Sequence, residues 1–172
     1  MLISKYEKKN SKVCSNIGLL EELGNFKNGK YKLQIEQCRL ALKLEGKTGY
    51  DKYKSQLPGV AFCGTFNNLR QAEQIAYYNN LLIIDIDDLD EETILDTKNQ
   101  VMQDVFTYAV FISPSGKGLK ILIKVDTGVE FHKLAFRAVT KYYLDKFNIN
   151  IDLSGSDCSR LCYVSWDSDI YI

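Results

Sequence analysis

Two aspartates one residue apart, Asp85 and Asp87, are the side chains in this sequence best suited to chemistry. They close the apolar stretch 82–87, whose composition is typical of a buried β-strand. Because side chains alternate along a strand, both carboxylates point to one face, about 6.5–7 Å apart. Two negative charges on an apolar strand are costly unless a cation neutralises them, and one or two divalent metal ions usually do so. The pair therefore predicts a metal site.

A third carboxylate is expected near the pair, because two close cations need about three anionic ligands besides a substrate phosphate. Asp152, which follows Ile151, is the predicted third ligand, and Asp157 in the same loop is the alternative. For the pair itself, the alternative is a strand end with two exposed aspartates. Further aspartates are interpreted as solvated turn residues: Asp88, Asp90, Asp167 and Asp169.

The loop 113–118 is a candidate phosphate site. Its two glycines and two serines let backbone N–H groups approach an anion closely, and its lysine supplies charge. It lacks the spacing and the following helix of a Walker A loop, so a plain hairpin turn is the alternative. The candidate nucleotide-binding residues here are Ser113, Ser115, Gly116, Lys117, Gly118 and, just beyond the loop, Lys120.

Two further cations are expected beside the carboxylates. The alternation that buries Leu119 and Ile121 puts Lys120 on the opposite face, which we expect to be the face of the aspartates. An exposed strand lysine is the alternative. Arg160 follows the acidic loop and could bind a phosphate or pair with Asp157.

The residue pattern predicts elements that would position these groups. Hydrophobic periodicity and turn residues indicate helices over 30–45, 68–78 and 90–104 and strands over 60–63, 82–87, 106–112, 119–125 and 161–166. Gly46 should close the first helix, and the strands 106–112 and 119–125 should pair as a hairpin. This order predicts an α+β fold with helices on one face of a sheet.

The last helix is predicted by a capping box. Thr127 and Glu130 have its Thr-x-x-Glu spacing, so the helix should begin there and continue to about Phe147. Its predicted apolar stripe comprises Phe131, Leu134, Ala135, Ala138, Val139 and Tyr142. The single histidine, His132, is interpreted as a surface or half-buried residue without a role.

Composition limits the class of protein. The 172 residues, 45% of them hydrophobic, fit one domain with a core, and 22 basic against 22 acidic residues give no global basic field. Five scattered cysteines and no leader segment predict reduced thiols in a cytoplasmic protein. Cys158 and Cys162 lack partners for a zinc site and are interpreted as small buried side chains. No apolar run approaches the ~20 residues that span a membrane.

Several motifs together resemble a known family. They are Leu57-Pro58-Gly59 with Gly64-Thr65-Phe66, the strand ending in Asp85-Ile86-Asp87, the hairpin 113–120, and Ile151-Asp152 leading to Ser159-Arg160-Leu161. In this order they resemble the catalytic domain of archaeo-eukaryotic primases. The resemblance is to the primase-polymerase branch, and within it to the VirE N-terminal-like domains found on mobile elements. It covers about residues 57–171.

The resemblance implies a fold and a reaction. The fold is an N-terminal α/β part packed on an RNA-recognition-motif-like antiparallel sheet, with a cleft between them. Residues 1–80 would form the first part and 81–172 the second, in a single domain that could belong to a longer chain. In this family Asp85, Asp87 and Asp152 would bind two Mg²⁺ or Mn²⁺ ions for template-directed attack of a 3′-hydroxyl on the α-phosphate of a nucleotide.

The expected partners are nucleoside triphosphates, a single-stranded DNA template and a fused or separate helicase in DNA replication, with no membrane. One departure from the family is Lys120, which stands where these primases typically carry a histidine that contacts the triphosphate. A lysine offers a point charge without the geometry of an imidazole. A non-catalytic nucleotide- or nucleic-acid-binding relative is therefore an alternative. A phosphohydrolase of the haloacid-dehalogenase type, which also uses a DxD strand, is a second.

Overall fold

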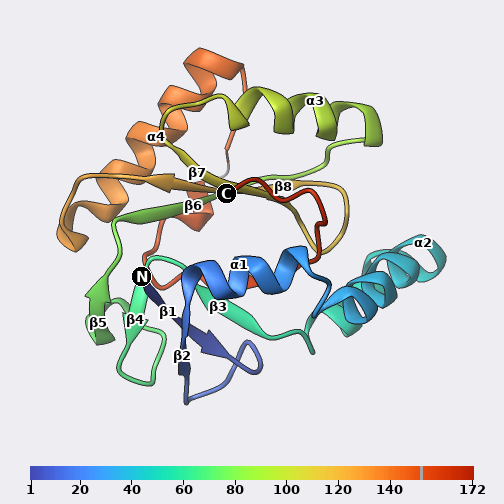
Figure 1. Ribbon diagram of the computed structural model, residues 1–172, viewed down its shortest axis with the longest axis horizontal. Coiled ribbons are helices and arrows are strands. Elements are labelled where there is room, and N and C mark those ends of the chain that lie inside the picture. Colours follow the sequence, from blue (N-terminus) through green and yellow to red (C-terminus); the bar gives the residue numbers. More distant parts are fainter. Residues whose placement is uncertain (152) are drawn as a thin grey trace.

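The strand that carries the aspartates lies in a three-stranded antiparallel sheet in the middle of the molecule (Figure 1). In this computed structural model, which describes residues 1–151 and 153–172, the sheet order is β6-β8-β7. Its strands are β6 (Leu81–Ile86), β7 (Thr107–Ile112) and β8 (Leu119–Lys124). Since β8 is antiparallel to both neighbours, β6 and β7 run parallel to each other. The predicted β7–β8 hairpin is confirmed.

The pairing of β6 with β8 sets the faces of this sheet. Asp85 lies directly opposite Lys120, and Ile84 lies opposite Ile121. Asp85 and Lys120 therefore share one face, while the isoleucines point to the other. The predicted alternation along 119–125, which puts Lys120 on the face of the aspartates, is confirmed.

Two helices cover the face of the sheet that points away from Asp85 (Figure 1). They are α3 (Glu91–Met102) and α4 (His132–Phe147). Asp90 caps α3, because its Oδ1 accepts the backbone N–H of Thr93 at 2.8 Å. The apolar side chains of β6 and β8 pack here against Ile94 and Phe136 in one of the buried clusters. The predicted helix over 90–104 is confirmed, and its acidic start acts as the cap.

The opposite face of the central sheet packs on a second layer. This layer is formed by β1 (Leu2–Tyr6), β2 (Ser15–Gly18), α1 (Leu19–Lys27), α2 (Lys32–Lys54), β3 (Gly59–Ala61) and the late strand β9 (Cys162–Tyr163). The strands form an antiparallel sheet of order β2-β1-β3-β9, and α1 lies between it and the central sheet (Figure 1). Phe26, Phe62 and Phe111 fill the core between the layers. A separate hairpin, β4 (Gly64–Phe66) with β5 (Ile75–Tyr78), flanks them.

Helix α2 is bent at Gly46. This residue has a φ of 69° and a ψ of −158°, so the helical path stops there and resumes to Lys54. This combination of a positive φ with an extended ψ is available essentially only to glycine. The predicted end of a first helical segment at Gly46 is confirmed, and the helical continuation puts the polar residues 47–54 beside the central sheet.

One predicted element is wrong, and two others are present but shorter than predicted. Residues 68–78 are not one helix: a 3₁₀ turn, Ala72–Gln74, precedes β5, because pairing with β4 outweighs the local helical pattern. Thr127 does not cap α4: a 3₁₀ turn, Val129–Phe131, comes first, and α4 begins at His132 without a side-chain cap. The closing strand is only β9, which pairs with β3.

The apolar stripe of α4 is also shifted from its predicted position. Phe131 and Leu134 are exposed, whereas His132, Phe136 and Tyr143 are buried. The predicted stripe is confirmed in part, because Ala135, Val139 and Tyr142 are partly buried and pack against this core. His132 is 3% exposed, so its interpretation as a surface or half-buried residue is wrong.

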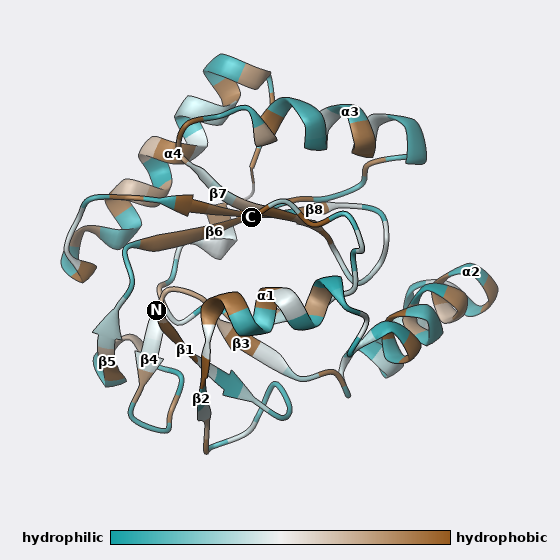
Figure 2. Cartoon of the chain, in the orientation of Figure 1, coloured by the Kyte–Doolittle hydropathy of each residue, from teal (hydrophilic) through white to brown (hydrophobic). Residues whose placement is uncertain are grey.

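The central strands are the most hydrophobic layer of the molecule (Figure 2). Leu81, Leu82, Ile83 and Ile84 are all buried, as expected for a strand covered on both faces. All five cysteines are free thiols, four of them buried, as predicted. Within residues 1–151 and 153–172, no helix is both long enough and apolar enough to cross a membrane.

Candidate functional site

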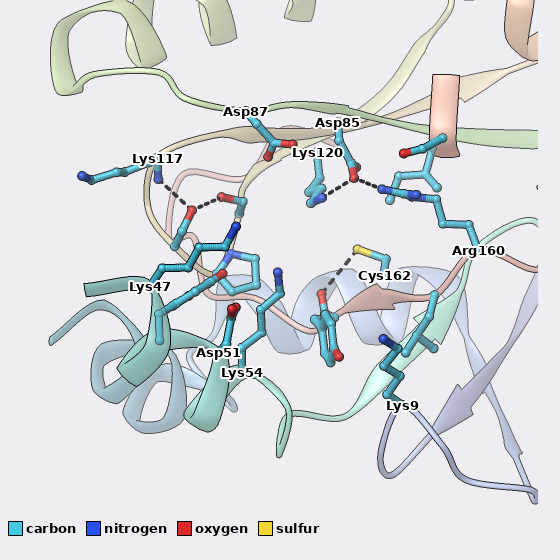
Figure 3. A pocket seen from close by; sticks show the side chains of 18 of the residues that line it. Lys9, Lys47, Asp51, Lys54, Asp85, Asp87, Lys117, Lys120, Arg160 and Cys162 are labelled. Carbon is cyan, nitrogen blue, oxygen red and sulfur yellow. Dashed lines mark hydrogen bonds and ion pairs between the residues drawn. The ribbon is translucent and has the colours of Figure 1, made fainter. Parts of the chain in front are cut away.

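A pocket of about 800 Å³ opens between the central sheet and α2 (Figure 3). Asp85 and Asp87 point into it from the end of β6, and Lys47 and Lys54 face them from α2. Among the described residues, seven basic and five acidic side chains line this pocket. They are Lys9, Lys47, Lys54, Arg70, Lys117, Lys120 and Arg160 with Asp51, Asp85, Asp87, Asp88 and Asp157. The pocket has a basic excess although the chain as a whole is neutral.

Asp85 is the most constrained carboxylate in the pocket. Its side chain is 11% exposed, and its Oδ2 lies 2.6 Å from both Lys120 Nζ and Arg160 NH2. Burial raises the pKa of Asp85, but the charges and hydrogen bonds of Lys120 and Arg160 outweigh burial and hold the pKa below its usual range. Asp85 is therefore a charged group, stabilised by two cations on one oxygen. Both predicted cations lie beside it, and Arg160 pairs with Asp85.

The remaining atoms of the pair fit a divalent metal. Asp85 Oδ1 is buried without a hydrogen-bond partner among the described residues, although buried polar atoms are normally paired. Asp87 is exposed and points into the same pocket (Figure 3). Hard cations such as Mg²⁺ and Mn²⁺ take carboxylate oxygens. The two aspartates thus offer suitable donors, whereas Asp85 Oδ2 is already occupied by Lys120 and Arg160.

The predicted third carboxylate, Asp152, lies outside the described residues. Its alternative, Asp157, lines the pocket, but its Oδ1 accepts the backbone N–H and the hydroxyl of Ser159 at 2.7 and 2.6 Å. Burial raises the pKa of Asp157, and these bonds from Ser159 more than compensate and lower it. In the part of the chain that the structure describes, no three His, Cys, Asp or Glu side chains are grouped to hold a metal ion.

The predicted phosphate loop forms the far wall of the pocket. Ser113, Ser115 and Lys117 line it. Three backbone N–H groups are already used inside the hairpin: Ser113 N bonds Gly118 O, Gly116 N bonds Ser113 O, and Lys117 N bonds Ser115 Oγ. The loop therefore offers side chains to a ligand rather than these three N–H groups, which differs from the predicted backbone cradle.

The two glycines of this loop shape the wall and are not among its lining residues. Gly116 has a φ of +75°, which suits the tight turn. At Gly118 a Cβ atom would lie 2.4 Å from the carbonyl oxygen of Ile86 and 3.3 Å from Asp87 Oδ1. Only glycine lets the hairpin approach the end of β6 this closely.

The base of the loop is held by a buried ion pair. Asp167 Oδ2 accepts Lys98 Nζ at 2.8 Å and the backbone N–H of Ile112 at 2.9 Å, and both charged side chains are almost fully buried. Arg39 of α2 adds a bond to the carbonyl of Ser113. The interpretation of Asp167 as a solvated turn residue is wrong, because the C-terminal segment folds back against β7.

A family model described as BT4734-like, N-terminal domain, matches residues 52–172, which is well over half of the chain. The chain belongs to this family. The matched segment contains every predicted site residue, and β1, β2, α1 and most of α2 precede it. No curated protein and no solved structure matches the chain.

The wall contributed by α2 was missed in the sequence. Lys54 lies over the rings of Tyr50 and Tyr163, and Lys47 extends toward the loop (Figure 3). Burial lowers the pKa of Lys54, and the positive charge of Lys120 lowers it further. The two lysines therefore repel each other across the pocket. Polar residues cluster at 47–54 in the sequence, but nothing local indicates that they face strands 30 and more residues away.

Proposed function

We propose that this pocket is the nucleotidyl-transfer site of a DNA primase-polymerase-like enzyme, which uses Mg²⁺ or Mn²⁺ to add nucleotides to a strand on a single-stranded DNA template. One observation carries the proposal. Two carboxylates at the end of β6 meet Lys120, Lys117 and Arg160 in a single pocket. Nucleotidyl transfer needs this combination of metal ligands and phosphate-binding cations.

The residues around the pocket have distinct roles in this proposal. Lys117, Lys120 and Arg160 would bind the triphosphate oxygens and neutralise the charge on the departing pyrophosphate. Asp85 and Asp87, with Asp152 as the proposed third ligand, would hold the metals. When bound, these ions supply Lewis-acid charge at the reacting phosphate. About 800 Å³ lies within the usual range of small-molecule sites, about 300–1,000 Å³.

The proposal also includes an RNA-recognition-motif-like sheet and a cleft between the two parts of the chain. The element order β6-α3-β7-β8-α4, with β8 between two parallel strands and both helices on one face, supports it. A pocket lined by α2 on one side and by β6 and the hairpin loop on the other supports the cleft. We further propose replication on mobile elements, with a fused or separate helicase, as its setting.

A non-catalytic nucleotide- or nucleic-acid-binding domain is the second candidate. It is favoured by the contact of Lys120 and Arg160 with Asp85 Oδ2, because these two cations already neutralise the carboxylate that a metal would need. The hydrolase alternative gains nothing from the described residues. In them, β6 lies in an antiparallel sheet, and only one helix, α3, lies between β6 and the hairpin.

Primer extension tests the enzymatic proposal. The protein is incubated with Mn²⁺, a primed single-stranded DNA template and labelled nucleotides, and the products are resolved by length. Wild type should extend the primer. Asp85→Ala and Asp87→Ala should reduce extension at least about 100-fold, because a metal at the reacting phosphate contributes several kcal/mol. Asp96→Ala, an exposed aspartate on α3, is the matched control and should retain full activity.

The outcomes separate the candidates. Nucleotide binding without any extended product would favour the non-catalytic domain. Equal activity in the Asp85 and Asp96 variants would refute the assignment of the site. Turnover of a simple phosphate monoester would instead revive the hydrolase.

A further inference from the structure

The feature that carries a further inference is the crowding of two cations on one oxygen of Asp85. Lys120 Nζ and Arg160 NH2 each lie 2.6 Å from Oδ2, while Oδ1 has no hydrogen-bond partner among the described residues. Asp87, two residues on, has its carboxylate exposed in the same pocket. A metal bound by this pair would therefore lie beside a carboxylate that is already neutralised by protein cations.

The two cations are held in different ways. The guanidinium of Arg160 packs against Gly155, where a Cβ would lie 3.1 Å from both its Cζ and its Nε. The Lys120 ammonium is a point charge on a flexible stem, held to Asp85 from directly across the strand pair. Because this stem is flexible, Lys120 can turn its ammonium from Asp85 into the pocket without moving the backbone.

An anion that enters the pocket gives Lys120 an alternative partner. Lys47, Lys54 and Lys117 surround the same space, so a triphosphate there would be attracted by several cations at once. In the absence of an anion, the positive charge of Lys54 favours keeping Lys120 on Asp85. The same residue can therefore serve the carboxylate in one state and the phosphates in the other.

We propose that Lys120 is a built-in counter-ion: it occupies Asp85 until a triphosphate draws it away, so that metal and triphosphate bind cooperatively. This counter-ion role rests on the proposed nucleotidyl-transfer site and adds how the metal and the triphosphate come to bind there together. It implies that the protein alone binds metal weakly, because the metal must compete with a tethered cation. Metal and nucleotide each remove an obstacle to the other, which is positive coupling between the two ligands.

The first test measures Mn²⁺ binding to the protein without nucleotide, by the loss of the free-ion signal in electron paramagnetic resonance. Lys120→Met keeps the aliphatic stem and removes the charge. It should bind Mn²⁺ at least about tenfold more tightly than wild type, which is the lower end of the effect of one ion-pair partner on a carboxylate. Lys124→Met, on the exposed end of the same strand, is the matched control and should bind like wild type.

The second test measures the binding of inorganic tripolyphosphate, in the absence of metal, by calorimetry. Asp85→Asn frees Lys120 and Arg160 from their carboxylate, so it should bind the anion about tenfold more tightly than wild type. Lys120→Met should bind it more weakly. Removal of the Asp85 carboxylate thus strengthens tripolyphosphate binding, and removal of the Lys120 charge strengthens Mn²⁺ binding. General destabilisation of the fold would weaken both. Circular dichroism checks that each variant is folded.

The outcomes distinguish this inference from the proposed function. If Lys120→Met binds Mn²⁺ no better than wild type, while Asp87→Ala abolishes Mn²⁺ binding, the counter-ion role is refuted and the metal site stands. The same holds if Asp85→Asn does not strengthen tripolyphosphate binding. If neither wild type nor Lys120→Met binds Mn²⁺ at millimolar concentration, the metal site itself fails, and the inference fails with it.

Discussion

At the scale of single residues, His132 shows how burial changes the chemistry of a side chain. It lies in the first turn of α4, with Nδ1 2.9 Å from the hydroxyl of Tyr78 and Nε2 4.0 Å from Cys63 Sγ. Burial lowers the pKa of His132 to about 4; the negative charge of Asp157 acts in the opposite direction, and Lys133 adds to the lowering. His132 is therefore neutral in the folded protein at physiological pH.

This shift predicts an acid-sensitive fold. The unfolded chain takes up a proton on this histidine below about pH 6.5, while the folded protein does so only near pH 4. Stability is therefore lost as the pH falls through this window. Between pH 7.5 and 5 the loss from this group should be about 2 kcal/mol.

Urea unfolding of wild type and His132→Gln at the two pH values measures this loss. The variant has no titrating group at the position, so its free energy of unfolding should fall by about 2 kcal/mol less than that of wild type. Carboxylates titrate in both proteins and cancel in the comparison. Parallel losses in the two proteins would mean that His132 does not carry the effect.

At the scale of elements, the hairpin β7–β8 joins the fold to the candidate site. Its strands supply the centre and one edge of the central sheet, and its loop lines the pocket. Gly118 lets the loop approach the end of β6, and Asp167 holds the loop base from the C-terminal segment. The position of Asp87 therefore depends on a contact between two segments about 30 residues apart.

The substitution Gly118→Ala should disturb the site and the fold together. The new methyl group would lie 2.4 Å from a backbone carbonyl oxygen, so backbone must shift, at a cost of about 1–3 kcal/mol. Since the same shift moves Asp87, Mn²⁺ binding should weaken as well. Urea unfolding and Mn²⁺ titration measure the two effects.

Gly24→Ala is the matched control for this substitution. Gly24 lies inside α1, and no atom would come within 4 Å of its new Cβ. An alanine there should leave the site intact and raise stability by about 0.5–1 kcal/mol, as is usual in helix interiors. If Gly118→Ala behaved like Gly24→Ala, the close approach at the loop would not matter.

At the scale of the whole molecule, the central sheet is shared by two cores. Phe62 and Phe111 belong to the core on the side of Asp85, and Phe136 and Ile121 to the core under α3 and α4. The C-terminal chain connects the layers a second time, because β9 pairs with β3 and Tyr171 bridges to Val110 of β7. Neither layer can be removed without exposing one face of an apolar sheet.

This arrangement predicts one cooperative unfolding transition. Fluorescence of Trp166, the single tryptophan, and far-ultraviolet circular dichroism should give the same midpoint in urea. Phe62 and Phe136 lie in different cores. Replacing either by alanine should lower the free energy of unfolding by about 3–5 kcal/mol and shift the midpoints of both signals together. Two separated transitions would show that the layers fold independently.

Local physics explains what could be predicted from the sequence alone. The two-residue period of a strand put Asp85 and Lys120 on one face, and the caps and turn residues of 90–118 located α3 and the hairpin. Each of these features depends on neighbours within about one element. The prediction over 68–78 failed because pairing of β5 with β4 outweighed a local helical pattern there.

Contacts between layers decided the rest. Lys120 and Arg160 lie 35 and 75 residues beyond Asp85 in sequence, and only the folding of the chain brings both to one oxygen. Lys47 and Lys54 line the same pocket because α2 continues past Gly46. The sequence by itself determined which side chains could do chemistry and which way they point along their strand. The tertiary structure decided which charges meet, because the packing of two layers across a shared sheet has no period that a sequence records.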